Sequence, residues 1–190
     1  MNPTNLTVDD IGQLLASGAA GEPVEEGASF THLDHALQTA TLLRAEVAER
    51  GQGEHDDALI VAGLVHDIGH LLPGVGDTEH GAAGAAGVRT ALGQRVAGLV
   101  GLHMAAKRYL VASGGEGTYG GGLSAGSVTS LSLQGGPMSS EERSRFEALP
   151  LFGDAVALRR ADDRGKVDGL VVDGLAAWME VVRRVAAGVA

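Results

Sequence analysis

The sequence predicts an all-α fold. Apolar residues recur at helical spacing through most of the 190-residue chain, whereas the alternation of apolar and polar residues that marks a half-buried strand is nearly absent. The composition favours close helix packing, with 30 glycines but only three Phe, two Tyr and one Trp. We therefore expect one helical bundle over residues 1–190, a length at which a single domain buries a sizeable core.

Capping and terminating residues place the individual helices. Thr7, followed by two aspartates, is typical of an N-cap and predicts a helix over about 7–19. A second helix is expected over 31–50. The stretch 56–72 is apolar on nearly all sides and precedes Pro73, so it predicts a central helix that its neighbours bury. Further helices are expected at about 79–92, 94–112, 140–149, 152–164 and 173–189, the last of them amphipathic.

One long segment has no helical pattern. Residues 114–136 contain nine glycines and a cluster of Ser and Thr, which is too long for a plain connector in a compact domain. Two interpretations stay open. The segment is either a mobile surface loop or a lid whose hydroxyl and backbone N–H groups close over an anionic ligand.

Charge and cysteine content exclude whole classes of function. A formal net charge of −10 without a basic run argues against nucleic-acid binding. The absence of cysteine excludes disulfides, zinc–thiolate sites, iron–sulfur clusters and thiol nucleophiles, so any metal must be bound by His and carboxylates. No apolar window of 18 residues and no leader-like N-terminus occur, and we expect a cytoplasmic protein without membrane contact.

Histidine and aspartate residues on the expected helices indicate a metal site. His66 and Asp67 fall in the most apolar stretch, where a buried carboxylate needs compensation that a divalent cation supplies. A lone His on an apolar face is ordinarily a core residue, but the candidates here are six, too many for one ion. They divide into two sites bridged by Asp67, whereas His32 and His55 are interpreted as surface residues. The six candidates are His35, His66, Asp67, His80, His103 and Asp162.

Six motifs together resemble a known family. The sequence is similar to the HD-domain superfamily over about residues 29–166, and within it to the phosphonate-cleaving branch of mixed-valence di-iron oxygenases, relatives of myo-inositol oxygenase. HMAAKRYL and LSLQGGPM are more specific for this branch than the HD dipeptide. The motifs are HLDHALQTA (32–40), HDIGH (66–70), EHGAAGA (79–85), HMAAKRYL (103–110), LSAGSVTSLSLQGGPMSSEE (123–142) and LRRADDRGK (158–166).

The resemblance implies two iron ions, one Fe(II) and one Fe(III), and assigns their ligands. Asp162, not Asp163, is the implied ligand because it precedes Lys166 by four residues, as in the family. Asp67 is shared by both ions. The first ion is implied to bind His35, His66, Asp67 and Asp162, and the second to bind Asp67, His80 and His103.

The resemblance also implies residues that bind the substrate phosphonate: His70, Lys107, Ser127, Ser130 and Arg159. Cations and hydroxyl donors suit an anion in an otherwise acidic protein. Alternatives stay open, because Lys107 and Arg159 could be ordinary solvated charges and the two serines lie in a Ser-rich loop.

Two further positions near the first ligand bear on the substrate and on ligand orientation. Gln38, three residues after His35, either orients a ligand or is a polar helix residue. The family often has a tyrosine ten residues before this ligand and a glutamate, which meets a substrate amine, seven before it. Glu25 and Ala28 occupy those positions here, and either Glu25 or Glu26 could replace the glutamate only if the loop shifts. The substrate amine is therefore less well supported than the metal chemistry.

Three functional hypotheses follow. The first is an oxygenase that uses O2 to oxidise and cleave a small C1-hydroxylated organophosphonate or similar anion. The second is an HD phosphohydrolase in which the same ligands bind Mn or Mg and activate water. The third is a non-catalytic metal-binding or sensing protein, which ranks lowest because an open coordination position is a liability to a structural metal site.

Overall fold

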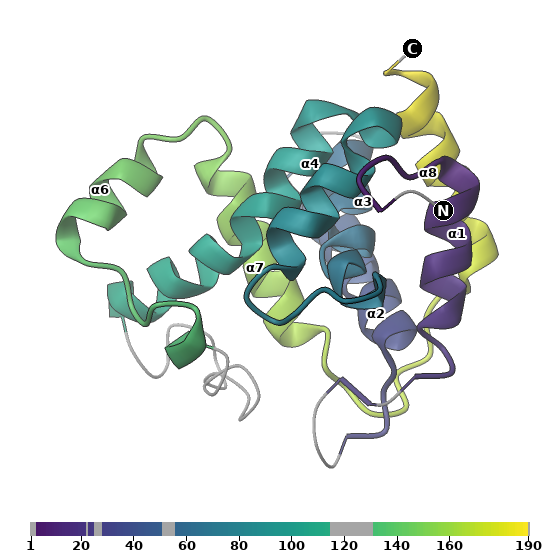
Figure 1. Ribbon diagram of the computed structural model, residues 1–190, viewed down its shortest axis with the longest axis horizontal. Helices are drawn as coiled ribbons and strands as arrows, with labels where there is room; N and C mark the ends of the chain where they lie inside the picture. Colours follow the sequence, from purple (N-terminus) through teal and green to yellow (C-terminus); the bar gives the residue numbers. More distant parts are fainter. Residues whose placement is uncertain (1–2, 22, 25–27, 51–55, 115–130, 190) are drawn as a thin grey trace.

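The computed structural model describes residues 3–21, 23–24, 28–50, 56–114 and 131–189. Within these ranges the chain forms helices and no strand, which confirms the all-α prediction (Figure 1). The elements are α1 (Val8–Ser17), α2 (His32–Glu49), α3 (Asp57–Val65), the short 3₁₀ helix η2 (Ile68–Leu71), α4 (His80–Gly114), α6 (Ser140–Glu147), α7 (Phe152–Arg164) and α8 (Leu175–Ala187).

The helix starts follow the capping signals. Thr7 and Thr31 each form a capping box in which the hydroxyl accepts from the backbone N–H three residues on, and Asp10 or Asp34 reaches back to the cap. Asp56 caps α3 by accepting from the backbone N–H of Leu59 at 3.2 Å. Local sequence therefore sets where these three helices begin.

The predicted central helix over 56–72 is wrong beyond residue 65. α3 ends at Val65, the next two residues form a turn, and η2 follows. η2 packs directly on the start of α4, since a Cβ on Gly69 would lie 2.0 Å from the carbonyl oxygen of His80. This close contact between backbones is incompatible with a side chain at residue 69. The HDIGH motif is thus a turn and a 3₁₀ helix, not the middle of an α-helix.

α4 is a helical hairpin. Gly93 inside it has φ +81° and ψ 175°, a left-handed conformation that L side chains rarely adopt. On one straight helix residues 80 and 103 would be roughly 35 Å apart, at 1.5 Å per residue. Their Nε2 atoms are 2.9 Å apart, so the two arms run back along each other. The prediction of two helices, over 79–92 and 94–112, is confirmed by the break at Gly93.

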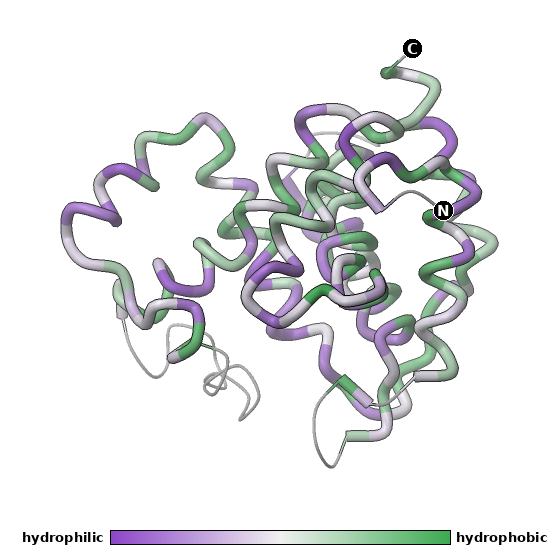
Figure 2. Tube along the Cα trace, viewed as in Figure 1, coloured by the Kyte–Doolittle hydropathy of each residue, from purple (hydrophilic) through white to green (hydrophobic). Residues whose placement is uncertain are grey.

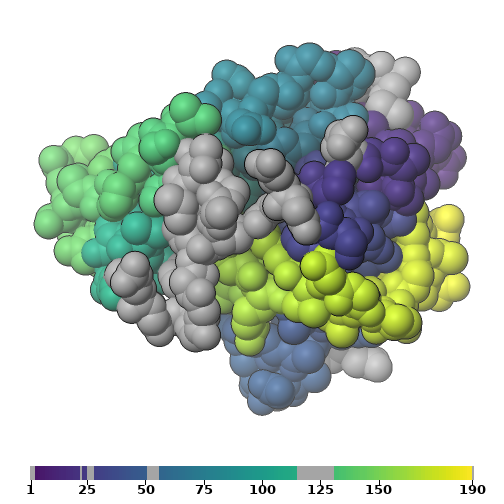
Figure 3. All heavy atoms as spheres, turned by 90° about the horizontal axis from the view of Figure 1, so that it is seen from below, coloured from purple at the N-terminus to yellow at the C-terminus, as the bar shows by residue number. Residues whose placement is uncertain are grey.

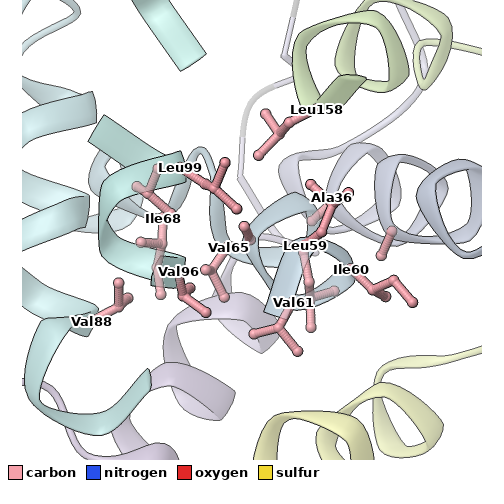
Figure 4. Close-up of a cluster of buried hydrophobic side chains, with 14 of the residues drawn as sticks. Ala36, Leu59, Ile60, Val61, Val65, Ile68, Val88, Val96, Leu99 and Leu158 are labelled. Atoms are coloured by element: carbon pink, nitrogen blue, oxygen red, sulfur yellow. The ribbon is translucent and has the colours of Figure 1, made fainter. Parts of the chain in front are cut away.

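α3 lies at the centre of the hydrophobic core. Figure 4 shows Leu59, Val61 and Val65 of α3 among side chains from η2, α4 and α7, and these residues are 1% exposed or less. Burial on all sides explains the uniformly apolar sequence of this helix. α3 is only nine residues long, and no helix in the described ranges is long and apolar enough to cross a membrane.

α6 lies apart from the bundle, beyond the end of α4 and the start of α7 (Figure 1). Its residues are mainly hydrophilic (Figure 2), and Phe146 is its one buried residue. The Phe146 ring contacts Tyr109 and Phe152 at centroid distances of 5.4 Å. Arg108 of α4 also pairs with Glu142 at 2.8 Å. A small aromatic cluster and an ion pair therefore attach α6 to the bundle.

Candidate metal centre

The six candidate ligands converge in the interior of the bundle. They come from α2, the turn after α3, both arms of α4, and α7, so the elements that build the core also bring these side chains together. On the face seen in Figure 3, the segment after α7 lies beside the residues before α2, where the backbone N–H and hydroxyl of Ser29 donate to Asp168. Ser29 lies just before the first candidate ligand and Asp168 just after the last. Their hydrogen bonds therefore hold together the two ends of the sequence region that supplies the ligands.

The carboxylate of Asp67 lies between two pairs of histidines. Its Oδ2 atom is 3.4 Å from Nε2 of His66 and 3.7 Å from Nε2 of His35. Its Oδ1 atom is 3.5 Å from Nε2 of His80 and 3.5 Å from Nε2 of His103. Each oxygen therefore faces a different pair, which is the arrangement of a carboxylate that bridges two cations.

Three side chains, His35, His66 and Asp162, form what we call the first group. Nε2 of His35 is 3.3 Å from Oδ1 of Asp162, and Nε2 of His66 is 3.8 Å from Oδ2. All three residues are buried, and neither Nε2 atom has a hydrogen-bond partner in the described part of the chain. Buried nitrogens without partners beside carboxylates fit a cation.

The backbone fixes the orientation of all four histidine rings. Each Nδ1 atom donates to a main-chain carbonyl, which leaves the Nε2 lone pair to face Asp67, as in histidines that bind metals. The donor–acceptor distances are 2.7 Å for His35 to Gly165, 2.8 Å for His66 to Gly63, 2.7 Å for His80 to Asp77 and 2.6 Å for His103 to Val100.

A second group consists of Asp67, His70 and His80, whose ligand atoms lie within 4.8 Å of one another. The ring of His70 stacks on that of His80 with 3.9 Å between centroids, and Nε2 of His80 is 2.9 Å from Nε2 of His103. His70 therefore lies beside the predicted ligand pair His80 and His103. It does so from η2, and not from the single α-helix over 56–72 that the sequence predicted.

Electrostatics keep both central carboxylates ionised. Burial raises the pKa of Asp67, but His66 together with His70 and His103 outweighs burial and holds this pKa well below the usual range. Burial likewise opposes ionisation of Asp162, but Arg159 and Lys166 lower its pKa. Burial lowers the pKa of His103 to about 3. Burial lowers the pKa of His66, but the carboxylates of Asp67 and Asp162 outweigh burial and raise it to about 9, so a cation that binds this ring would displace its proton.

The two predicted phosphonate-binding cations are both buried, which makes the alternative of ordinary solvated charges wrong. Lys107 and Arg159 are each 4% exposed. Nζ of Lys107 donates to Oε1 of Gln134 at 3.3 Å, and burial, with Arg159 nearby, lowers the pKa of Lys107 to about 8. NH1 of Arg159 donates to Asp162 at 2.7 Å, and Nε donates to Asp163 at 3.1 Å. Arg159 thus contacts a predicted metal ligand directly.

Gln38 is connected to the predicted ligand His35 only through the backbone of the segment after α7. Its side-chain amide donates to the carbonyl oxygen of Val167 at 2.9 Å and accepts from the N–H of Val167 at 3.0 Å. This pair of bonds fixes the segment that includes Gly165, whose carbonyl accepts from Nδ1 of His35. Gln134, in contrast, was missed as a site residue, although it lies within the LSLQGGPM motif.

The interpretation of His32 as a surface residue is wrong. Its side chain is partly buried, and its ring centroid is 5.6 Å from that of His70. Burial lowers the pKa values of His32 and His70. The sequence did contain a signal for the partial burial of His32. His32 and His35 are three residues apart, and such positions share a helix face.

Several predicted residues lie outside the described part of the chain: Ser127, Ser130, Glu25, Glu26 and His55. Most of the glycine-rich segment 114–136 also falls outside it, so neither interpretation of that segment is tested. The roles predicted for these residues and for this segment stay predictions.

Comparison with known proteins agrees with this geometry. A family model described as "HD domain" matches residues 33–144. The chain belongs to the HD-domain family. This HD-domain protein is 39% identical over 156 residues to the hydroxymethylphosphonate dioxygenase of Gimesia maris, which is 77% of this chain and 73% of the relative. It is 40% identical over 154 residues to a protein of Leisingera caerulea named [1-hydroxy-2-(trimethylamino)ethyl]phosphonate dioxygenase (glycine-betaine-forming), covering 77% and 71%.

The similarity to phosphonate dioxygenases of this family, which the motifs predicted, is therefore confirmed. An uncharacterized protein of Acanthamoeba polyphaga mimivirus is also 34% identical, over 74% of this chain and 65% of its own length. Both the His/Asp cluster and these relatives indicate metal use by this HD-domain protein.

Proposed function

We propose that this HD-domain protein is an oxygenase that uses O2 and two iron ions to oxidise and cleave a small C1-hydroxylated organophosphonate. The observation that carries the proposal is the position of Asp67, whose two oxygens face separate histidine pairs. The names of two relatives at about 40% identity support the reaction and substrate class.

The two ions would have different numbers of protein ligands. His35, His66, Asp162 and Asp67 would hold the first ion, whereas Asp67, His80 and His103 would hold the second. Iron supplies the one-electron chemistry that O2 requires. Two histidines and one carboxylate leave coordination positions open, so the second site is where this chain would admit substrate.

The buried cations would hold the anionic end of the substrate. Lys107 and Gln134 lie within hydrogen-bonding distance of each other, and Lys107 is also close enough to Arg159 for the guanidinium to lower its pKa. A phosphonate needs such fixed donors in a site shielded from water. His70, stacked on His80, would add a donor beside the second ion.

The decisive test is aerobic turnover of hydroxymethylphosphonate by protein loaded with iron. We expect O2 consumption, phosphate release in equal amount, two irons per chain, and an electron-spin resonance signal of a coupled Fe(II)/Fe(III) pair. Anaerobic hydrolysis of phosphate esters with Mn or Mg would instead identify a phosphohydrolase. Tight metal binding without turnover of either substrate would identify a metal-binding protein.

Ala28 lies seven residues before His35, where the family often has a glutamate that meets a substrate amine. Comparing substrates with and without an amine tests the effect of this difference. Ala28 offers no carboxylate to a substrate amine. We expect a 2-amino-1-hydroxyalkylphosphonate and its analogue without the amine to be consumed with similar efficiency. O2 consumption with the two compounds measures this directly. A preference above about a hundredfold for the aminated compound, about 2.7 kcal/mol, would show that an acidic residue such as Glu25 or Glu26 binds the amine.

A further inference from the structure

Four buried side-chain atoms in the described residues have no hydrogen-bond partner: His35 Nε2, His66 Nε2, Thr39 Oγ1 and His32 Nδ1. The first two face Asp67 and Asp162 and are explained by the proposed first ion. Thr39 is a small hydroxyl packed 2.7 Å from where a Cβ on Gly165 would lie. The proposed metal centre does not explain the fourth atom, His32 Nδ1.

His32 is held at the edge of the second group. It is the first residue of α2, and its Cβ would be 3.2 Å from a Cβ on Gly18 at the end of α1. The N–H of Leu33 donates to the carbonyl of Gly18 at 3.4 Å, which fastens the start of α2 to the same glycine. The position of the His32 ring is therefore set by packing between two helices.

The ring of His32 continues a row of imidazoles that ends at a predicted metal ligand. Its centroid is 5.6 Å from that of His70, and the centroid of His70 is 3.9 Å from that of His80. Nδ1 of His70 is also 3.7 Å from Oδ1 of Asp77. His32 and His70 thus lie together on the more exposed side of the second group, where the proposed substrate would bind.

A buried ring nitrogen without a partner costs free energy unless a ligand or an ordered water bonds to it. An anionic oxygen is a strong partner, because charge-assisted hydrogen bonds are stronger than neutral ones. A phosphonate has three oxygens, enough for Lys107 and for imidazole donors at the same time. Such an anion satisfies the nitrogen and explains why a histidine occupies this position.

We propose that His32 is a substrate-binding residue whose Nδ1–H donates a hydrogen bond to a phosphonate oxygen beside His70. The inference rests on the proposed function and adds to it a residue that none of the motifs assigned. The proposal assigns the hydrogen bond to Nδ1 and not to Nε2. Asn and Gln place an amide nitrogen near one or the other of these positions, so substitution by each of them tests the assignment.

The experiment compares three variants of the metal-loaded protein. In H32N the amide nitrogen takes the place of Nδ1, in H32Q it takes the place of Nε2, and H32L retains bulk without a donor. The probe is methylphosphonate, which lacks the C1 hydroxyl and is not turned over, and calorimetry gives its Kd. We expect H32L and H32Q to weaken binding about tenfold to a hundredfold, and H32N to stay within about threefold of the unmodified protein.

Turnover of hydroxymethylphosphonate provides the second readout. KM should rise by the same factor in H32L and H32Q, with kcat within about twofold, because the lost bond contributes to binding. Metal content should stay at two ions per chain in all three variants. A purely structural role for His32 would instead lower the melting temperature and metal content of H32N and H32L alike.

The outcomes separate this inference from the proposed function. If the unmodified protein neither binds methylphosphonate nor turns over hydroxymethylphosphonate, the proposed function fails and the inference fails with it. If the unmodified protein binds methylphosphonate and H32L binds it equally well, only the inference fails, and a water is the partner of Nδ1. Binding retained by H32Q and lost by H32N would overturn the assignment to Nδ1.

Discussion

The first and second groups use similar ligands but differ in exposure. His35, His66 and Asp162 are each 2% exposed or less. In the second group His80 is 4% exposed, but the side chains of Asp67 and His70 are 21% and 23% exposed. A cation in the first group would be enclosed by protein, and one in the second group would be within reach of small molecules. This difference supports the proposal that the first group would hold a metal ion and that substrate would approach the second.

The largest effect is expected from Asp67, which joins the two halves. D67A should abolish turnover and release at least one metal, because it removes an anionic ligand that both ions would share. Metal analysis and O2 consumption measure this, and circular dichroism separates loss of metal from loss of fold. D57A, which removes an aspartate paired with Arg184 on the surface, should retain both metals. Near-normal turnover with two metals in D67A would show that Asp67 does not bridge.

A substitution at Gly69 should disturb mainly the second group, because η2 carries His70. In G69A the new methyl group would meet the carbonyl of His80 at 2.0 Å, so η2 must move away from α4 and carry His70 with it. Displacing a site residue by about 1 Å can cost about a hundredfold in rate, and we expect a loss of this order in kcat/KM. The first ion should stay bound, which metal analysis checks. G153A, where nothing lies within 4 Å of the new Cβ, is the matched control.

Substitutions at Lys107 and Arg159 should have the same effect on substrate binding but different effects on metal binding. K107M and R159M should each raise KM about tenfold to a hundredfold, since hydrogen bonds to charged groups contribute about 1.5–3 kcal/mol. Only R159M should also weaken the first ion, because Arg159 donates to Asp162 at 2.7 Å. Iron titrations of both variants test this. Equal metal affinity in the two variants would show that Arg159 does not orient Asp162.

The smallest effect is a pH dependence of substrate binding. Burial and neighbouring Arg159 lower the pKa of Lys107 to about 8, so its ammonium is charged below that pH and neutral above it. Binding of an anion is therefore strongest below pH 8 and weakens as pH rises through it, with KM increasing up to about tenfold per pH unit. In K107M this rise should disappear. A profile unchanged by the substitution would assign the titration to another group.

The sequence predicted the helices well because their determinants are local. Capping boxes and helical periodicity mark α1 and α2, and α7 begins and ends at the predicted residues 152 and 164. The break after Val65 was not predictable in this way. The 3₁₀ helix that follows the break packs against the carbonyl of His80, eleven residues beyond Gly69, and apolar periodicity carries no information about such a contact.

The site residues were likewise predictable where the signal lay in the local sequence, and not where it lay in contacts between helices. The six predicted ligands were found because His and Asp in apolar stretches are conspicuous, and the structure brings them together. Their roles as ligands stay predictions. Arg159 pairs with Asp163 four residues on along α7, which spacing can predict, but the burial of Arg159 and of His32 depends on packing between helices, which composition and spacing do not reveal. His32 was interpreted as a surface residue because it lies at the predicted start of a helix, but packing places its ring 5.6 Å from that of His70.

The turn at Gly93 has a consequence for how the centre assembles during folding. His80 and His103 are 23 residues apart and lie on two arms of one hairpin, so little chain entropy opposes their meeting. His35 and Asp162 are 127 residues apart, and α7 must dock on α2 before they meet. We expect the two histidines of α4 to approach each other early and the first group to close last. The nascent chain would therefore present a partial metal site, weaker than the finished one, before the bundle is complete.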